Sequence, residues 1–217
     1  MVIFVTGGAR SGKSRFAESY AEHLGTSGIY IATAQIYDEE MAERVRQHQS
    51  QRAETGFPWK TVEEPYSLAE WLADGSRGDE TTTAVKDSAS GFTASAALAS
   101  SDSASGLARD GVVLVDCLSL WLSNWLLRFE GEPDAADRVE RKVEELVAAL
   151  AGYSGIVLVV SNEVGGGIVP EYPLGRLYRD LAGRMNQKVA AVSEQAFLVT
   201  AGIPVELKSI AFRMDKR

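Results

Sequence analysis

The sequence predicts an α/β fold, a three-layer sandwich in which helices cover both faces of a mostly parallel central sheet. Strand-like runs alternate with helical patterns along the chain, which implies a layered fold with right-handed crossovers. Several of the runs are almost entirely Val, Ile and Leu, as in strands that are buried on both faces. The 217 residues are 45% hydrophobic and 24% charged, a composition that suits a sizeable core.

Six runs are predicted to be strands, of which the first, third and fourth are the most apolar: Val2–Thr6, Gly28–Thr33, Val112–Asp116, Ile156–Ser161, Ala196–Thr200 and Pro204–Leu207. Apolar stripes at helical spacing predict three helices between them, over Phe16–Leu24, Val139–Leu150 and Leu174–Val189. Pro133 and Asp134 are a candidate cap for the second helix. A shorter helix is expected at about Tyr66–Ala73.

The segment Asp74–Asp110 interrupts this alternation, because Ser, Ala, Thr, Gly and Asp dominate it and large apolar residues are few. Such a segment buries too little surface to offset the entropy of ordering it. We therefore expect a single domain over residues 1–217 with a flexible insertion at about 74–110. A weak helix around Phe92–Ala99 is the alternative.

Charge and cysteine content limit the possible partners. The formal net charge of -8 and the pI of about 4.9 disfavour binding to nucleic acid or to an anionic membrane. The only cysteine, Cys117, allows neither an intrachain disulfide nor a cysteine zinc cluster, which suits the cytoplasm. Val2–Thr6 lacks the basic flank of a signal peptide, and Val112–Leu127 is too short to span a bilayer. We expect a soluble cytoplasmic protein without membrane insertion.

The first strand leads into a segment that matches G-x-x-x-x-G-K-[ST] in full: Gly7, Gly8, Ala9, Arg10, Ser11, Gly12, Lys13 and Ser14. Small residues allow backbone N–H groups to turn toward phosphate oxygens, and the following helix directs the positive end of its dipole at the same anion. Lys13 is expected to reach the β- and γ-phosphates, and Ser14 to bind Mg²⁺. An ordinary glycine turn is the alternative, but the strand before and the helix after predict a P-loop NTPase, RecA-like in type.

Asp116 is a second candidate for metal binding. It ends a buried strand, and open α/β sheets bind ligands at the carboxyl ends of their strands. A P-loop enzyme needs such an acid to hold Mg²⁺, usually through water. The alternative is that Asp116 caps the helix that follows.

Seven segments, spread over nearly the whole chain in order, carry a resemblance to a known family: Thr6–Ser14, Tyr30–Ala34, Met41–Arg52, Thr61–Pro65, Asp116–Asn124, Ser161–Pro170 and Asp180–Gln187. They resemble the bifunctional adenosylcobinamide kinase/adenosylcobinamide-phosphate guanylyltransferase family of cobalamin synthesis. The chain departs from that family at Asp74–Asp110, where the family usually has a short connection.

The resemblance implies two reactions, phosphorylation of adenosylcobinamide by ATP or GTP and then transfer of GMP from GTP to the product. It implies Mg²⁺, a covalent GMP–histidine at His48, and a homo-oligomer, with a trimer suspected. The family's nucleotide contacts correspond to the phosphate loop and to Ala32, Thr33, Ala34, Gln49, Ser50, Gln51, Arg52, Glu63 and Asp116.

The residues around His48 fit that role without requiring it. Arg44, His48 and Arg52 fall on one face of a predicted helix, where guanidinium groups could stabilise charge on a phosphorus under attack by imidazole. An ordinary exposed histidine is the alternative. His23, at the end of the first helix, is read only as a cation near the helix C-terminus.

Three other features allow two readings each. Gly165–Gly167 is either a mobile cover or an adaptable loop, and Trp121 and Trp125 either line a corrin-sized opening or pack in the core or between subunits. Three arginines either contact phosphate or lie on a solvated helix face: Arg176, Arg179 and Arg184.

Two alternative functions are considered. One is a P-loop kinase of another small alcohol or nucleotide. The other is a regulatory GTP switch, against which the sequence lacks the N-K-x-D segment that reads guanine.

Overall fold

The computed structural model describes residues 1–35, 39, 43, 46, 50, 52, 54–75, 111–212 and 214. Seven strands form one sheet in the order β3-β2-β4-β5-β1-β6-β7. The strands are β1 (Val2–Gly7), β2 (Gly28–Ala32), β3 (Trp59–Glu63), β4 (Val112–Asp116), β5 (Ile156–Asn162), β6 (Gln195–Thr200) and β7 (Ile203–Glu206). All neighbours are parallel except β6 and β7, which are antiparallel. The predicted mostly parallel sheet is confirmed.

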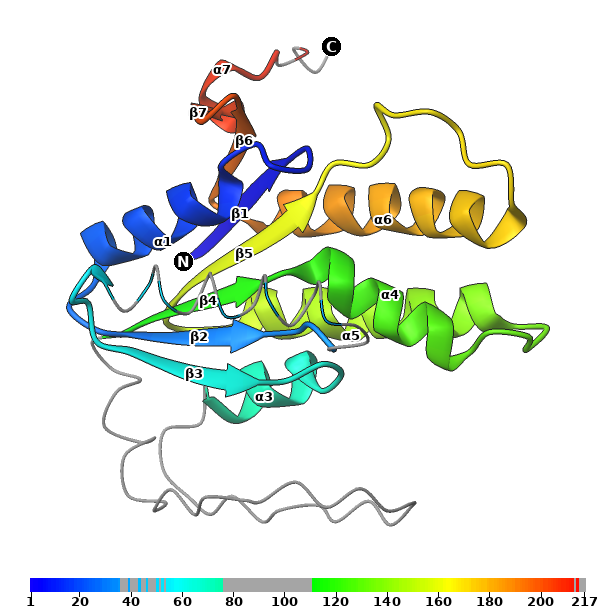
Figure 1. Ribbon diagram of the computed structural model, residues 1–217, viewed down its shortest axis with the longest axis horizontal. Coiled ribbons are helices and arrows are strands. Elements are labelled where there is room, and N and C mark those ends of the chain that lie inside the picture. Colours follow the sequence, from blue (N-terminus) through cyan, green and yellow to red (C-terminus); the bar gives the residue numbers. More distant parts are fainter. Residues whose placement is uncertain are drawn as a thin grey trace.

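Helices cover both faces of the sheet, but unequally (Figure 1). The described helices of eight or more residues are α1 (Lys13–Leu24), α3 (Leu68–Gly75), α4 (Leu118–Arg128), α5 (Ala135–Gly152) and α6 (Pro173–Val192), and α7 (Leu207–Ile210) is a single turn. Successive strand residues alternate between the faces: Ile3 and Leu114 pack with α1, whereas Phe4 and Val115 pack with α4, α5 and α6. The three predicted layers are present, and the helix predicted at about Tyr66–Ala73 is α3.

The strand β3 was not predicted, and the reason is its place in the sheet. It lies at the edge beside β2, and Lys60, Thr61 and Glu63 are exposed. An edge strand of this kind lacks the apolar run by which the buried strands were recognised. At the other edge, Leu207 begins α7 instead of ending β7 as predicted.

The carboxyl ends of the parallel strands meet at one edge of the sheet, where the arrowheads of β2, β3, β4 and β5 lie together (Figure 1). The loops that leave this edge carry most of the predicted functional residues. The predicted insertion lies outside the described residues apart from Asp74 and Gly75, in the last turn of α3. In the described part of the chain, no helix has both the length and the apolar character needed to cross a bilayer.

Candidate active site

The phosphate loop joins the end of β1 to the start of α1, and its shape depends on two glycines. A Cβ on Gly7 would lie 2.4 Å from the carbonyl oxygen of Val199 and 2.6 Å from Ser11 Oγ, closer than side-chain atoms approach. Gly12 has a φ of 92°, in the left-handed region that glycine adopts without strain. The segment Gly7–Ser14 therefore forms the strand–loop–helix turn that the sequence predicts.

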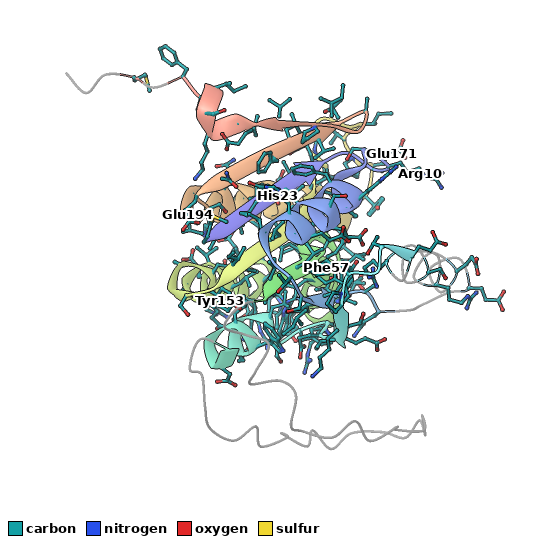
Figure 2. All side chains as sticks on the ribbon, turned by 90° about the vertical axis from the view of Figure 1, so that its left-hand side faces the viewer. Arg10, His23, Phe57, Tyr153, Glu171 and Glu194 are labelled. Atoms are coloured by element: carbon teal, nitrogen blue, oxygen red, sulfur yellow. The ribbon has the colours of Figure 1, made fainter. Side chains whose placement is uncertain are left out.

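The polar groups of this loop are arranged to receive an anion. Lys13 folds back along the loop, and its Nζ donates a hydrogen bond to the Gly8 carbonyl oxygen at 3.2 Å. The first turn of α1 contains no acidic residue, and Gly12 at the N-cap offers no side chain. The positive end of the helix dipole is therefore not offset locally by a carboxylate. Arg10 is exposed and projects from the loop (Figure 2).

Asp116 is the last residue of β4, two strands from the phosphate loop, because β5 lies between β4 and β1. Its Oδ2 accepts a hydrogen bond from the Tyr30 hydroxyl at 3.1 Å. The N-cap of the next helix is Cys117. Asp116 thus stands one residue before the capping position, and its carboxylate is hydrogen-bonded by Tyr30 of β2.

Sheet register brings three predicted nucleotide contacts to one level. Ala32 of β2 is the register partner of Glu63 on β3 and of Asp116 on β4. The backbone of Glu64 continues the pairing by donating to the Ala32 carbonyl oxygen at 2.9 Å. These residues are far apart in the sequence, and the parallel pairing of the strands alone explains why they meet at the carboxyl edge.

Thr33 ties the ends of β2 and β4 together. It is fully buried, and its Oγ1 donates to the Cys117 carbonyl oxygen at 2.7 Å and accepts from the Cys117 backbone N–H at 2.9 Å. Asn124 of α4 donates to the Thr33 carbonyl oxygen at 2.8 Å. Burial raises the pKa of the Cys117 thiol to about 11, and the nearby Asp116 charge adds to this, so the thiol stays protonated.

Arg52 is the predicted nucleotide contact whose surroundings differ most from a surface site. Its side chain is 6% exposed, and Nη1 lies 3.5 Å from Glu18 Oε1 on α1. Its guanidinium carbon lies 3.6 Å from the centre of the Tyr30 ring. Loss of hydration raises the pKa of the Glu18 carboxyl to about 7, although the charge of Arg52 opposes the shift. Burial also raises the pKa of Tyr30, so its hydroxyl keeps the proton that it donates to Asp116.

The oxygens at this edge fit a hard cation held together with phosphates. Among the buried side-chain oxygens that have no hydrogen-bond partner in the described residues, three lie at or next to this loop, namely Thr6 Oγ1, Ser11 Oγ and Asn162 Oδ1. They belong to β1, to the phosphate loop and to the adjacent end of β5. In the described part of the chain, no three His, Cys, Asp or Glu side chains form a metal cluster. The oxygens of Thr6, Ser11 and Asn162 are of the kind that Mg²⁺ prefers, since it binds one or two protein oxygens together with waters and substrate phosphates.

Part of the predicted site falls outside the described residues. His48, Gln49 and Gln51 are among the residues that the structure does not describe, whereas Ser50 is described and exposed. The structure therefore places the phosphate loop, Ala32, Thr33, Glu63 and Asp116 along the same carboxyl edge of the sheet, with Ala32, Glu63 and Asp116 in register.

Comparison with known proteins decides which P-loop family this is. The family model described as cobinamide kinase/cobinamide phosphate guanyltransferase matches residues 3–109 and 94–207. The chain belongs to this family. The fold, with its phosphate loop and mostly parallel sheet, agrees with that membership.

Relatives of known name are similar over nearly their full length. The bifunctional adenosylcobalamin biosynthesis protein CobU of Escherichia coli is 36% identical over 218 residues, which cover 96% of this chain and 100% of that protein. The protein of the same name from Salmonella typhimurium is also 36% identical. CobP of Pseudomonas aeruginosa, likewise named a bifunctional adenosylcobalamin biosynthesis protein, is 36% identical over 94% of this chain and 95% of its own length.

A buried hydrogen-bond network links α4, β5 and α6, and its members were not predicted as site residues. Asn162 donates from Nδ2 to Ser119 Oγ at 3.0 Å. Asn186 donates to the Asn162 carbonyl oxygen at 3.1 Å and accepts from Ser161 Oγ at 2.7 Å. These residues lie within the segments that carry the family resemblance. The sequence signal was therefore available, but only the structure shows that those segments meet.

The two tryptophans of α4 pack in the protein. Trp121 is 1% exposed, and its Nε1 donates to the Tyr66 carbonyl oxygen at 2.8 Å. Trp125 is partly buried against the same core, and its ring lies edge-on to that of Tyr66. Of the two alternatives predicted for Trp121, the structure therefore shows core packing and not the lining of an opening.

The three arginines of α6 named above bind neighbouring parts of the chain through hydrogen bonds or an ion pair. Arg176 donates to the carbonyl oxygens of Pro170 and Glu171. Arg179 donates to the carbonyl oxygen of Gly165. Arg184 instead pairs with Glu140 on α5 at 2.9 Å. Two of the three side chains therefore fasten the loop between β5 and α6, including the predicted Gly165–Gly167 segment, to the helix that follows it.

Proposed function

We propose that this chain catalyses two successive transfers to adenosylcobinamide. In the first, a phosphoryl group passes from ATP or GTP to the aminopropanol hydroxyl of the substrate. In the second, GMP from GTP is joined to that phosphate, which releases pyrophosphate and gives adenosylcobinamide-GDP. The observation that carries the proposal is that the phosphate loop and Asp116 follow parallel strands to the same carboxyl edge of the sheet, in a chain of the cobinamide kinase/guanyltransferase family.

In the kinase step, the substrate hydroxyl oxygen attacks the γ-phosphorus, the bond to the β–γ bridging oxygen breaks, and the hydroxyl proton is lost. The backbone N–H groups of Gly7–Ser14 and the Lys13 ammonium hold the triphosphate and offset its developing charge. Mg²⁺, bound by Ser14 and through water by Asp116, would neutralise the phosphate oxygens. The unpaired buried oxygens of Thr6, Ser11 and Asn162 at this edge support a site lined by oxygen atoms.

In the guanylyl step, an unprotonated nitrogen of His48 attacks the α-phosphorus of GTP and pyrophosphate leaves. A phosphate oxygen of the phosphorylated cobinamide then attacks the same phosphorus, the N–P bond breaks, and the free imidazole returns. Ala32, Ala34 and Glu63, together with Gln49, Ser50 and Gln51, are proposed nucleotide contacts. The shared register of Ala32, Glu63 and Asp116 supports part of this set.

Replacement of His48 separates the two activities. In His48→Ala, labelling of the protein by α-labelled GTP and guanylyl transfer should be lost, while phosphorylation of adenosylcobinamide continues because the phosphate loop does not use the imidazole. The wild-type adduct should be a phosphoramidate, stable in base and labile in acid. Its formation should weaken below about pH 6.5, where a free histidine becomes protonated.

His23→Ala is the matched control, because His23 is exposed near the last turn of α1 (Figure 2) and is predicted only to interact with the helix dipole. That variant should retain both activities and the adduct. Label on a residue other than His48, or guanylyl transfer that survives in His48→Ala, would exclude the histidine mechanism and leave the kinase proposal standing. A chain that phosphorylates but never forms an adduct would be a simple kinase.

We further propose that the chain forms a homo-oligomer. The residues Ile203, Val205, Ile210, Phe212 and Met214, named here the C-terminal apolar surface, are between 40% and 90% exposed. They lie on and beyond β7, the strand at one edge of the sheet. An edge strand with exposed apolar side chains is a common site of association with another copy.

A further inference from the structure

Four side chains from different parts of the chain form a row on the α1 face of the sheet. Glu18 of α1 pairs with Arg52 at 3.5 Å. The Arg52 guanidinium lies over the ring of Tyr30, 3.6 Å from its centre. The Tyr30 hydroxyl donates to Asp116 Oδ2 at 3.1 Å. The row therefore runs without a break from the helix behind the phosphate loop to the carboxylate at the end of β4.

The first three members of this row are enclosed by protein. Arg52 is 5% exposed and Tyr30 is 5% exposed, and the Glu18 side chain is 14% exposed. Burying a guanidinium is unfavourable unless a carboxylate and an aromatic face replace its water. Both replacements are present, and the guanidinium is therefore fixed in place between Glu18 and Tyr30.

The geometry points to a positioning role: we propose that Glu18 and Arg52 fix Tyr30, and that Tyr30 orients the Asp116 carboxylate for metal binding. This inference rests on the proposed metal role of Asp116. It assigns Arg52 an indirect part, because its charged group is engaged by Glu18 and Tyr30 and not presented at the surface. Partners that orient a metal ligand commonly matter nearly as much as the ligand itself.

The register of the sheet explains why Tyr30 can reach Asp116. Tyr30 pairs with Leu114, and Asp116 is two residues further along β4. Residues two apart in a strand project from the same face, so Tyr30, Leu114 and Asp116 all lie on the α1 side. The Tyr30 hydroxyl therefore reaches a carboxylate two residues beyond its register partner. A phenylalanine at position 30 could have the same shape but could not donate this hydrogen bond.

Metal binding measured without cobinamide tests the inference. Mn²⁺ is titrated by electron paramagnetic resonance into the protein with the non-hydrolysable ATP analogue AMP-PNP, and AMP-PNP binding is measured separately in EDTA. Tyr30→Phe should weaken Mn²⁺ binding by roughly 10–100-fold, with AMP-PNP binding in EDTA unchanged. Glu18→Gln should weaken Mn²⁺ binding in the same direction but less. Tyr153→Phe, at the C-cap of α5, is the matched control and should bind Mn²⁺ as the wild type does.

Arg52→Met distinguishes an indirect role from direct nucleotide contact. If Arg52 acts through Tyr30, adding Arg52→Met to Tyr30→Phe should weaken Mn²⁺ binding little further. If Arg52 contacts nucleotide, the two losses should add and AMP-PNP binding in EDTA should weaken as well, which would overturn the inference. Unchanged Mn²⁺ binding in Tyr30→Phe would overturn it equally.

Folding is checked for each variant by thermal unfolding. Glu18→Gln has nearly the shape of the native side chain, so it serves as the test of the ion pair if Arg52→Met fails to fold. Unchanged Mn²⁺ binding in a folded Glu18→Gln would show that Glu18 and Arg52 have no part in positioning Asp116. Because no step involves cobinamide, failure of the proposed transfer reactions would leave these results interpretable. The inference and the proposed function can therefore fail separately.

Discussion

Both proposed reactions depend on Lys13, because each begins with a bound triphosphate. Its ammonium group donates a hydrogen bond to the Gly8 carbonyl oxygen. Lys13→Ala should lower kcat/KM of both transfers by about 10²–10³-fold, the usual cost of removing one charge-stabilising donor. Lys188→Ala, which removes only a pair with Glu144 on the protein surface, should leave both rates unchanged. Near-normal turnover of Lys13→Ala would contradict the assignment of the phosphate loop.

Glu18 should make the stability of the fold depend on pH near neutrality. Burial raises the pKa of the Glu18 carboxyl in the folded chain to about 7, above its ordinary value of 4.5. Its neutral form therefore stabilises the fold at low pH, and this contribution is lost as the pH rises through 7. From pH 6 to 8.5 the free energy of unfolding of the wild type should fall by about 1 kcal/mol relative to that of Glu18→Gln.

Urea unfolding of both proteins at several pH values measures this difference. Working above pH 6 keeps the protein away from its pI of about 4.9, where low net charge favours precipitation. Glu144→Gln, at an exposed pair, should show the same pH dependence as the wild type. Parallel stability curves for Glu18→Gln and the wild type would show that the carboxyl is not perturbed.

At the scale of single residues, the sequence predicted groups that act locally and missed groups that act across the sheet. The phosphate loop is contiguous, so spacing alone revealed it. The contact between Arg52 and Glu18 joins residues 34 apart, and that between Tyr30 and Asp116 joins residues 86 apart. Both contacts depend on β2 lying beside β4, which no local pattern specifies.

Among the elements, predictability followed burial. The strands β1, β4 and β5 carry continuous apolar runs and were predicted close to their true bounds. The edge strand β3 is largely exposed and polar, so it resembled a loop. Asp134 stands at the predicted N-cap of α5, yet its side chain makes no capping hydrogen bond. The sequence therefore predicted where α5 begins, but not how the Asp134 side chain is oriented there.

The elements on either side of the proposed insertion should fold without it. Leu68 and Leu72 of α3 are fully buried, and β4 is paired on both sides, with β2 and β5. Replacing residues 76–109 with a short Gly/Ser linker should leave the midpoint of thermal unfolding nearly unchanged, since loop closure changes by only about 0.6 kcal/mol per doubling of loop length. Kinase activity should also persist. Loss of the cooperative thermal transition would show that this segment is structural.

In the whole molecule, the phosphate loop follows β1, an inner strand of the sheet, whereas the C-terminal apolar surface lies at one edge strand and β3 is the opposite edge strand (Figure 1). If the C-terminal apolar surface contacts another copy, Ile210→Asp or Phe212→Asp should lower the mass found by sedimentation velocity without loss of cooperative unfolding. Ile168→Asp, at a residue 97% exposed in the loop before α6, is the matched control and should leave the mass unchanged. A wild type that sediments as a monomer at micromolar concentration would contradict the proposal.

The central proposal is that one chain performs both transfers, and product analysis tests it most directly. The purified protein is incubated with Mg²⁺, GTP and adenosylcobinamide, and the corrinoid products are resolved by mass over time. We expect adenosylcobinamide phosphate first and adenosylcobinamide-GDP after it, with release of pyrophosphate. Phosphorylated product that never gains GMP would limit the chain to a kinase, and unchanged adenosylcobinamide would contradict the proposed function as a whole.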